Sequence, residues 1–546
     1  MSMSTWPNRF VRKLAAGYPA ETLARYVPTR KLAVECGTRG ILIACIVGLS
    51  ACVSLPLHEQ RTSSAALDAP ADSSLGRLAS NSLSVPTASG FQILPISHAA
   101  MAARIALANR AEKTLDVQYY ELAGDATGRL FLRALHDAAI RGVRVRVLID
   151  DLHTVGEDAL LSSFAATPNV EVRLFNPFPA GRSSVVMRFI RSWNDLRRVD
   201  HRMHNKLFIA DNIFAIMGGR NIAGEYFLRK PDQNFLDIDL LAAGAITRDL
   251  SKSFDTYWNS AYAYPIGSIV APRTAGLSDR YFMEQAKQSA IQAQVESNAG
   301  MELYEAIPEE LNGASIKLIE ADARVVSDLP EKIDPSGIGE SEDTVRREFV
   351  RMTDTAHHEV VGVSPYFIPG RQGMAHIKEV LDRGVRLRIF TNSLASNDAI
   401  LAHIGYARYR RRLLKLGVEL YELNPALPFK RGRFGDFGAS RAQLHAKLAM
   451  VDRKTLFMGS MNLDNRSANL NTEVAIIVDS PELCGEVHRL MDFGSAYHVR
   501  LTSKGDLEWV GSVEDYVEIL HDDPDSTEME RLEVELLSPI MPEGPL

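Results

Sequence analysis

The sequence predicts an α/β fold made of two tandem copies of one domain. The segment RGVRVRVLIDD at 141–151 recurs as RGVRLRIFTNS at 383–393, and VEVRLFNP at 170–177 recurs as VELYELNP at 418–425. A strand-like segment precedes each pair, TLDVQYYEL in the first half and EVVGVSPYFI in the second. Because the order is kept at offsets of 242 and 248 residues, we interpret the two halves as a duplication.

The elements of the first copy follow in order along the chain. We expect an alanine-rich helix over about 98–110, a strand over 114–122, a helix over about 128–141 and a β-branched strand over 143–150. A strand, a helix and a second strand in succession indicate a parallel crossover, which is the basis of the α/β class.

Composition shifts suggest the domain boundaries. We place the first domain at residues 91–270 and the second at 340–500, with a C-terminal extension at 501–546. The connector, 271–339, contains Gly, Pro and acidic residues around one expected strand within ASIKLIEADARVV. Residues 53–90 are rich in Ser, Ala and Leu without a helical or strand period, so we expect a flexible tether.

Residues 1–52 are expected to be a signal or anchor segment. Arg39 is followed by an apolar run from Ile41 to about Ala51, which is short for a membrane span and well sized for a signal sequence. The run ends in LSAC, which resembles the bacterial lipoprotein signal, in which Cys52 would be lipidated. An uncleaved short anchor is the alternative interpretation. Either one ties the body of the protein to a membrane.

Composition and charge exclude several classes of protein. With 46% hydrophobic and 24% charged residues, the 546-residue chain is neither disordered nor fibrous. The net charge is −7, but residues 1–51 hold seven Lys/Arg and two Asp/Glu, which leaves 54 basic and 66 acidic residues in the remainder. Sequence-independent electrostatic binding of nucleic acid is therefore not expected. Of the four cysteines only Cys484 lies in the body, so no disulfide framework is expected.

One pattern of polar residues occurs once in each copy. Both copies read H-x-K-x4-D-x6-G-[GS]-x-N, as HNKLFIAD followed by GGRN and as HAKLAMVD followed by GSMN. The members of the pattern are His204, Lys206, Asp211, Asn221, His445, Lys447, Asp452 and Asn462. Period-2 alternation would place the His and the Lys of each copy on one face of a strand. Chance does not explain two extended matches in a duplicated chain.

This doubled motif resembles the signature of the phospholipase D superfamily, from about residue 91 onward. Within it, SPYFIP, GSMNLDNRS and NTE resemble bacterial cardiolipin synthases of the short type, which lacks paired N-terminal transmembrane helices. The resemblance implies two tandem phospholipase D-like α/β/α domains related by a pseudo-twofold axis, with mixed sheets flanked by helices. It also implies one shared active site that works through a covalent phosphohistidine.

The residue types fit this chemistry. Two imidazoles with a pKa near neutral suit phosphodiester exchange, since a neutral one can attack phosphorus and a protonated one can deliver a proton to the leaving alcohol. By motif position, the resemblance makes His204 the nucleophile and His445 the acid and then the base. The non-bridging oxygens would be held by the other polar members of the motif, Lys206, Lys447, Asn221 and Asn462. Because side chains neutralise the phosphate, we expect no metal and no cofactor.

A nucleophilic imidazole also needs an acceptor that fixes its tautomer. Glu473 in NTEVAII fits that role in the second copy, and Asp237 is its counterpart in the first, with Asp239 as the competing choice. Asp211 and Asp452 fall at the turn after the strand, where a structural role is open as well as a catalytic one.

Three residues of the second copy lack an equivalent in the first. Ser460 is a candidate donor to the phosphate, but the first copy has Gly219 at that position. Asp464 and Arg466 in NLDNRS are expected to support one side of the site or to help select the substrate.

Each copy carries a basic and aromatic insert before its His, at 188–202 and 428–437. On a helix the apolar residues of the first insert would share one face ringed by arginines; these residues are Phe189, Ile190, Trp193 and Leu196. Such a segment suits an anionic membrane interface, and a surface helix packed on its own domain is the alternative.

Three functions are compatible with these features. The leading hypothesis is phospholipid transphosphatidylation, in particular cardiolipin synthesis from phosphatidylglycerol with or without phosphatidylethanolamine. The alternatives are a hydrolytic phospholipase D or exported phosphodiesterase or nuclease, and an idle membrane-tethered binding module. We expect anionic phospholipids and the membrane surface as partners, no nucleic acid, and a periplasm-facing lipoprotein of the bacterial cell envelope. No protein partner can be inferred.

Overall fold

The computed structural model describes residues 55–56, 61–271, 280–284, 287, 309–334, 344–425, 437, 440–491, 496–513 and 516–539. The predicted signal or anchor segment with Cys52 lies outside these residues, as does nearly all of the second insert. Within the described ranges, no helix combines the length and the apolar character that crossing a membrane requires.

The first domain is built on a mixed sheet that has nine strands in the described residues. Their order is β10 (Ile319–Glu320), β1 (Ser89–Leu94), β8 (Asp239–Gly244), β6 (Phe214–Gly218), β5 (Leu207–Ala210), β2 (Thr114–Tyr119), β3 (Arg144–Asp150), β4 (Val170–Phe175) and β9 (Ala263–Pro265). Helices α4 (Ser97–Arg110), α5 (Ala126–Ile140) and α6 (Asp158–Ala165) pack on one face, and α9 (Ala245–Trp258) packs on the other. The helices and strands predicted for 98–150 are confirmed.

The second domain has a mixed sheet with ten strands in the described residues. Their order is β11 (Asp322–Ser327), β18 (Val474–Asp479), β17 (Thr455–Gly459), β16 (Leu448–Val451), β12 (Glu359–Val363), β13 (Arg386–Asn392), β14 (Glu419–Leu423), β19 (Tyr497–Leu501), β20 (Leu507–Val513) and β21 (Tyr516–Leu520). Helices α13 (Val345–Asp354), α14 (Gly370–Asp382) and α15 (Ile400–Leu416) cover its outer face, and α17 (Pro481–Leu490) lies on the inner one.

The two sheets share a core of six strands in the same order. The strands β8-β6-β5-β2-β3-β4 correspond to β18-β17-β16-β12-β13-β14. Directions correspond too: β2, β3 and β4 run parallel, as do β12, β13 and β14, while the strands on the other side pair antiparallel. The predicted duplication of an α/β domain with a mixed sheet flanked by helices is confirmed.

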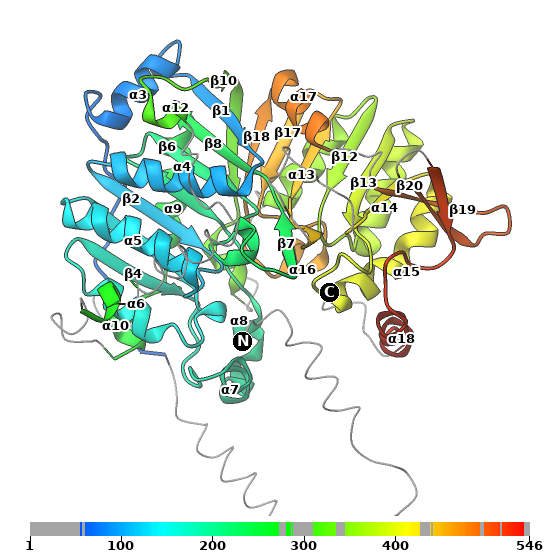
Figure 1. Ribbon diagram of the computed structural model, residues 1–546, viewed down its shortest axis with the longest axis horizontal. Helices are drawn as coiled ribbons and strands as arrows, with labels where there is room; N and C mark the ends of the chain where they lie inside the picture. The colour runs from blue at the N-terminus through cyan, green and yellow to red at the C-terminus, as the bar shows by residue number, and fades with distance from the viewer. Residues whose placement is uncertain are drawn as a thin grey trace, which may run out of the picture.

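A shared core joins the two domains into one body. Side chains from the inner faces of both sheets form one buried cluster, to which α9 contributes Leu250 and Phe254 and α17 contributes Leu483 and Val487. Helix α17 contacts β1 of the first sheet and β17 of the second, and Figure 1 shows it where the domains meet, while α9 contacts β8 and β11. Because this cluster buries apolar surface from both copies, neither inner face could be left in water without a large loss of stability.

The predicted boundaries of the second domain are too narrow. The connector holds two strands rather than one: β10 extends the first sheet through β1, and β11 pairs with β18 at the edge of the second sheet. The C-terminal extension adds β20 and β21 to the far edge, followed by α18 (Glu528–Leu537). These added strands form backbone hydrogen bonds with strands that are distant in the sequence, and composition does not reveal such pairings.

Part of the predicted flexible tether is folded instead. Helix α3 (Ser74–Ser82) is capped by Ser73 and buries Leu75 and Leu78 against the first domain. Upstream of it, the main chain of Ala66 donates to Asp255 of α9. Two leucines three residues apart anchor a nine-residue helix, but they are too few to give a visible period among so many Ser and Ala residues.

Candidate active site

Each His-x-Lys segment lies just before its strand and is held by the other domain. The expected strand alternation is wrong here, since β5 begins at Leu207 and β16 at Leu448, after the motif lysines. The main-chain N–H of His204 donates to Thr472 at 2.9 Å, and that of His445 donates to Leu236 at 2.8 Å. The strands β7 (Gln233–Leu236) and β15 (Arg441–Leu444) also pair in parallel across the domains. Backbone pairing between the copies therefore brings both histidines to the domain interface.

The carboxylates that orient the histidines come from the opposite domain. Nδ1 of His204 lies 3.0 Å from Oε2 of Glu473, and Nδ1 of His445 lies 2.7 Å from Oδ2 of Asp237. We expected each carboxylate to serve its own copy, which is wrong. Glu473 directly follows Thr472 and Asp237 directly follows Leu236, so the interdomain backbone bonds place each carboxylate beside the partner histidine.

Asp239, the competing choice for Asp237, has another role. Its carboxylate lies 2.9 Å from Arg104 and 3.3 Å from Arg220, and all three side chains are buried in the first domain. Burial and these ion pairs place Asp239 among the structural groups of the first domain, so Asp237 alone faces His445.

The two motif lysines bracket the same space as the histidines. Nζ of Lys206 donates to the carbonyl of His204 at 2.7 Å, and Nζ of Lys447 donates to that of His445 at 2.5 Å. All four residues are buried, and the most exposed of them, His204, has only 7% of its surface accessible to solvent. Four cationic or ionisable groups are thus gathered in one buried site, where an anion would neutralise them.

Burial and mutual repulsion shift the pKa values of these groups. Burial lowers the pKa of His204 to about 4 and that of Lys447 to about 8. Burial, then the charges of Lys447 and Lys206, hold the pKa of His445 well below its usual value. The pKa of Lys206 is also lowered well below normal by burial and then by Lys447. Both imidazoles are therefore neutral near pH 7 when no anion is bound.

The two orienting carboxylates differ in ionisation. Burial alone would raise the pKa of Glu473, but His204 and its hydrogen bond lower it below the usual range. Burial raises the pKa of Asp237, although Lys447 and Arg220 oppose the rise. The site thus holds one strongly ionised carboxylate and one that binds a proton more readily.

Ser460 and Gly219 account for part of this difference. The Ser460 hydroxyl donates to Oε2 of Glu473 at 2.5 Å, so its only proton is not directed at a phosphate as we expected. At the equivalent position in the first copy, a Cβ on Gly219 would lie 2.5 Å from Oδ1 of Asp237. The glycine is required there because the Asp237 carboxylate occupies the space that a side chain would fill.

The motif asparagines follow β6 and β17, each three residues past the end of its strand. Oδ1 of Asn221 accepts the Glu121 main-chain N–H at 3.3 Å, and its Nδ2 donates to the Tyr226 hydroxyl at 2.8 Å. The main-chain N–H of Asn462 donates to Ser467, while its buried Oδ1 has no hydrogen-bond partner among the described residues. Asn462 can therefore accept a hydrogen bond from a ligand.

The motif aspartates lie at the far end of each strand and hold backbone turns. Asp211 accepts the main-chain N–H groups of three consecutive residues, Glu112, Lys113 and Thr114. Asp452 accepts those of His357, His358 and Glu359 in the same way. Both aspartates have positive φ, 55° and 51°, at the turn that follows the strand. This geometry favours the structural role over the catalytic one.

Asp464 and Arg466 support the site from the second domain. Asp464 caps α16 (Asn465–Asn469) by accepting the Ser467 N–H, and burial raises its pKa to about 6. Arg466 reaches the first domain, where it lies 3.0 Å from Asp200. The Ser467 hydroxyl donates to Glu473 at 2.7 Å, so this short helix also fixes the carboxylate.

Sequence reasoning missed the aromatic rings that enclose the histidines. Tyr120 lies edge-on to His204 with ring centroids 5.1 Å apart, and the ammonium of Lys206 lies 5.2 Å from the same ring. Tyr226 and Phe235 lie 5.0 and 4.8 Å from the ring of His445. Their signal was the aromatic residues in QYYE, GEYF and QNFL, which look like ordinary core residues in a single sequence.

No metal centre is evident in the part of the chain that the structure describes. In those residues no three His, Cys, Asp or Glu side chains are grouped as metal ligands would be. The polar groups that could hold an anion include the two lysines, Lys206 and Lys447, which lie close enough for the charge of Lys447 to lower the pKa of Lys206.

Comparisons with known proteins agree with this geometry. A family model described as "Cardiolipin synthase, PLD-like domain" matches residues 105–258 and 349–492. Cardiolipin synthase C of Escherichia coli (strain K12) is 35% identical over 449 residues, covering 80% of this chain and 92% of that protein. Cardiolipin synthase A of Pseudomonas aeruginosa (strain LESB58) is 25% identical over 395 residues, covering 72% and 64%.

A solved structure supports the fold. The crystal structure of phosphatidylserine synthase from Haemophilus influenzae Rd KW20 matches with a TM-score of 0.53 and 13% identity, covering 82% of this chain and 93% of that one. At that identity the match shows a common fold. With the two family-model matches and the E. coli relative, it establishes that this chain belongs to the family of phospholipase D-like cardiolipin synthase domains and is an enzyme of the phospholipase D superfamily.

Proposed function

We propose that the protein transfers a phosphatidyl group between alcohols by double displacement. Nε2 of His204 attacks phosphorus, the bond to the leaving alcohol oxygen breaks, and His445 gives that oxygen its proton. In the second step His445 takes the proton of an acceptor hydroxyl, whose oxygen displaces His204 from phosphorus. The observation that carries this proposal is the single buried site in which two His-Lys pairs from the two domains meet.

The assignment of His204 as nucleophile is supported by its partner. An ionised Glu473 accepts a hydrogen bond from the Nδ1–H group and thereby leaves the lone pair on Nε2 for attack. Two serine hydroxyls and the Asp328 carboxylate, which accepts the Glu473 main-chain N–H, hold this acceptor in place. The nucleophilic nitrogen is thus set in one tautomer before substrate binds.

The contacts of His445 suit a residue that gains and loses a proton. Its Nδ1 lies 2.7 Å from Asp237 and 2.9 Å from Nζ of Lys447. One ring nitrogen cannot donate to a carboxylate and accept from an ammonium at the same time, so the two contacts are alternatives. A bound phosphate would draw the ammonium away, which favours the protonated imidazole that the first step requires.

The substrate that we propose is phosphatidylglycerol, alone or with phosphatidylethanolamine, and the product is cardiolipin. Support comes from two relatives that are named cardiolipin synthases, one of which is matched over 92% of its length. Hydrolysis by water, as in a phospholipase D or an exported phosphodiesterase or nuclease, uses the same first step. The acceptor separates transfer from hydrolysis, and the phosphodiester that is cleaved separates a lipid enzyme from a nuclease.

The test is to incubate vesicles of labelled phosphatidylglycerol with the purified protein and to separate the products. Cardiolipin as the main product, with phosphatidic acid as the minor one, is the expected result. Phosphatidic acid without cardiolipin would show a hydrolase, and cleavage of single-stranded DNA without lipid turnover would show a nuclease. Adding phosphatidylethanolamine to the vesicles identifies the second lipid.

An exposed apolar surface supports a membrane as the partner. The first insert forms α7 (Val185–Arg191), a 3-10 turn at Trp193–Asp195 and α8 (Leu196–Asp200). Ile190, Trp193 and Leu196 are 47, 53 and 47% exposed, whereas the arginines Arg188 and Arg198 turn inward to main-chain carbonyls of the same domain. Trp at such a surface, with Arg191 and Arg197 still exposed, suits the headgroup region of an anionic bilayer.

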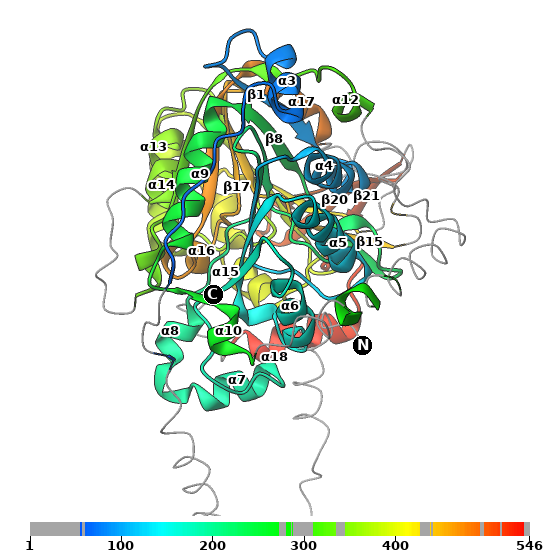
Figure 2. The same ribbon diagram turned by 90° about the vertical axis from the view of Figure 1, so that its left-hand side faces the viewer.

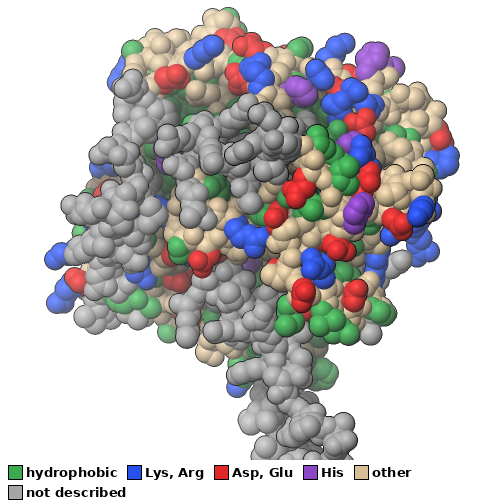
Figure 3. Space-filling model, turned by 45° about the vertical axis from the view of Figure 1, so that its right-hand side comes forward, with side chains coloured by type: hydrophobic (Ala, Val, Ile, Leu, Met, Phe, Trp, Pro, Cys, Tyr) green, Lys and Arg blue, Asp and Glu red, His purple; other side chains and the backbone are tan. Residues whose placement is uncertain are grey.

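A second exposed apolar stripe lies at the same end of the molecule. Figures 1 and 2 both show α18 at the lower end with α7 and α8, and Figure 3 shows hydrophobic side chains gathered there. In α18 this stripe is formed by Met529, Leu532 and Leu536, which are 47–64% exposed. We place this end against the bilayer, with residues 1–52 as the signal or anchor of an envelope lipoprotein acylated at Cys52.

A further inference from the structure

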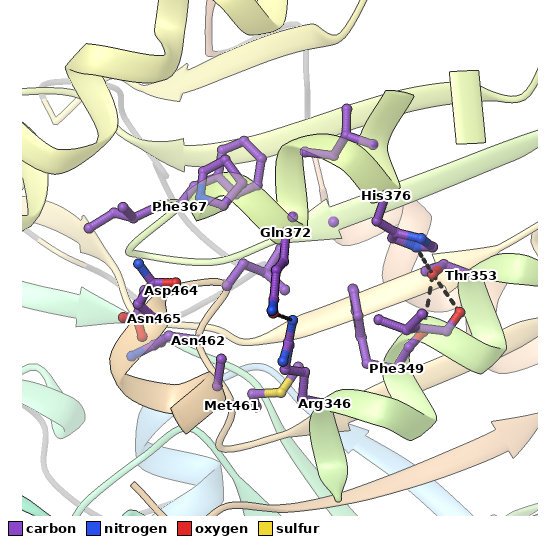
Figure 4. Close-up of a pocket in the computed structure, with 18 of the residues that line it drawn as sticks. Arg346, Phe349, Thr353, Phe367, Gln372, His376, Met461, Asn462, Asp464 and Asn465 are labelled. Atoms are coloured by element: carbon purple, nitrogen blue, oxygen red, sulfur yellow. Dashed lines mark hydrogen bonds between the residues drawn. The ribbon is translucent and has the colours of Figure 1, made fainter. Parts of the chain in front are cut away.

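A cavity of about 370 Å³ lies inside the second domain, under its outer helices. It runs between α13, α14 and the sheet, and the loop that follows β17 closes one end. Figure 4 shows Asn462, Asp464 and Asn465 at that end and Thr353 with His376 at the other. The cavity is thus elongated and points from the motif loop into the body of the domain.

The cavity and the catalytic centre share residues. Asn462 and Asp464 line the cavity, and Asp464 lies close enough to Lys447 and Glu473 for their charges to shift its pKa. Oδ1 of Asn462 is buried without a partner among the described residues, and the residue is only 7% exposed. A ligand that occupies the cavity would therefore pass beside the asparagine that borders the phosphate-binding groups.

The walls of the cavity are apolar. The apolar side chains of the lining include Phe349, Phe367, Ile377, Leu387, Ile389 and Met461. Several of the polar lining groups bond to one another: Arg346 bonds to Gln372, and the Thr353 hydroxyl lies 2.8 Å from His376. Most of the interior therefore offers neither donors nor acceptors, which suits a hydrocarbon rather than a sugar or a nucleotide.

We propose that this cavity holds one acyl chain of the phospholipid whose phosphate lies between the two His-Lys pairs. The inference rests on the proposed function, because it identifies the tail that accompanies the reacting headgroup. Three features support this occupant: an elongated shape, an apolar lining and an end formed by the motif loop that carries Asn462 and Asp464. Burial of methylene groups there would add binding energy that a short-chain lipid cannot gain.

The test compares two substrates with the same headgroup and long or short acyl chains, dioleoyl- and dihexanoyl-phosphatidylglycerol, in mixed detergent micelles. Filling the cavity with Ile377→Trp should lower kcat/KM for the long-chain lipid by about tenfold. The kcat/KM for the short-chain lipid should change by less than about twofold. The matched control is Ile140→Trp, which alters an isoleucine 61% exposed on the first domain and should change neither. Equal losses for both lipids in a folded Ile377→Trp protein would overturn the proposal.

Two further measurements cover the case in which Ile377→Trp does not fold. Phe349→Ala enlarges the cavity and should shift the chain-length preference upward, so an unchanged preference argues against an acyl chain. In the Phe349→Trp variant, phosphatidylglycerol brominated in mid-chain should quench the fluorescence of the new tryptophan. Quenching no greater than in the Ile140→Trp variant would contradict the proposal. Quenching needs no turnover, so it separates failure of this site from failure of the proposed function, which would show as wild-type protein that converts neither lipid.

Discussion

The two halves of the active site carry the same His-Lys pair but hold it differently. His204 faces Glu473, whose carboxylate also accepts two serine hydroxyls and has a lowered pKa. His445 faces Asp237, which lacks such a hydroxyl because Gly219 stands where Ser460 stands in the other copy, and whose pKa is raised. The difference teaches that a duplicated motif can divide two chemical roles through the residues around it.

The crossing of the carboxylates makes the division possible. Each histidine takes its orienting group from the other copy, so a change in one domain alters the histidine of its partner. In a site assembled within one copy, Ser460 would tune His445. Here Ser460 donates to Glu473, the carboxylate that faces His204. The proposed roles of the two histidines can therefore be tested separately.

The largest expected effect comes from removing either histidine. His204→Ala and His445→Ala should each lower turnover of phosphatidylglycerol by about 10³-fold or more, since neither can replace the other in a double displacement. An ester with a p-nitrophenol leaving group needs no proton, so His445→Ala should still release a burst of p-nitrophenol and gain the mass of the phosphatidyl group. A burst in the His204→Ala variant but not in the His445→Ala variant would make His445 the nucleophile and His204 the acid.

The next effect separates the two carboxylates. Glu473→Gln should lower kcat by about 10²-fold, because it removes an ionised acceptor that fixes the tautomer of His204. Asp237→Asn should lower kcat by only about tenfold. Asp237 binds a proton more readily than Glu473 in the wild type, so a neutral side chain there is a smaller change. Both changes preserve shape, and circular dichroism checks the fold. A larger loss for Asp237→Asn would contradict the comparison.

The pH dependence of kcat/KM tests the lysine of the second half. The Lys447 charge is present below its pKa and is lost as pH rises through about 8, so activity should fall above that pH. The attacking base of His204 is present above its pKa and is lost as pH falls through about 4. Lys447→Arg should move the alkaline limb upward. An alkaline limb that stays in place in this variant would assign it to another group.

A smaller effect is expected at the position where the two copies differ. Ser460→Ala removes one donor to Glu473 and should lower kcat only a few fold, because the Ser467 hydroxyl still donates to the same carboxylate. In the mirror change, Gly219→Ser, the new Cβ would meet the Asp237 carboxylate, so the loss should exceed that of Ser460→Ala. Steady-state kinetics on the same lipid compares the two, and equal losses would remove the proposed asymmetry.

The smallest effect concerns the surface rather than the site. Trp193→Ser with Leu196→Ser should weaken binding to vesicles that contain phosphatidylglycerol by a few fold, with little change on micellar dihexanoyl lipid. Ile140→Ser, another exposed apolar residue, is the matched control. Sedimentation with vesicles measures both. Vesicle binding that is unchanged in the double variant would favour the alternative of a surface helix packed on its own domain.

The sequence by itself determined the duplication, the α/β class, the order of the repeated strands and the eight members of the motif. These are local or repeated signals: strand composition, RGV and Asn-Pro elements, and fixed spacings such as His204 to Lys206. They can be read from one chain because a repeat supplies its own comparison. Asp237 and Glu473 were also found, from their register in the two copies.

Only the tertiary structure decided which groups meet. The exchange of Glu473 and Asp237 between the domains, the turn of Ser460 toward Glu473 and the entry of β10 and β11 into different sheets all depend on contacts between residues far apart in the chain. Helix α3 depends on the same kind of contact, since Leu75 and Leu78 need the first domain to be buried. Local periodicity carries no record of such pairings, because they are fixed by packing and backbone hydrogen bonds that exist only once both copies have folded together.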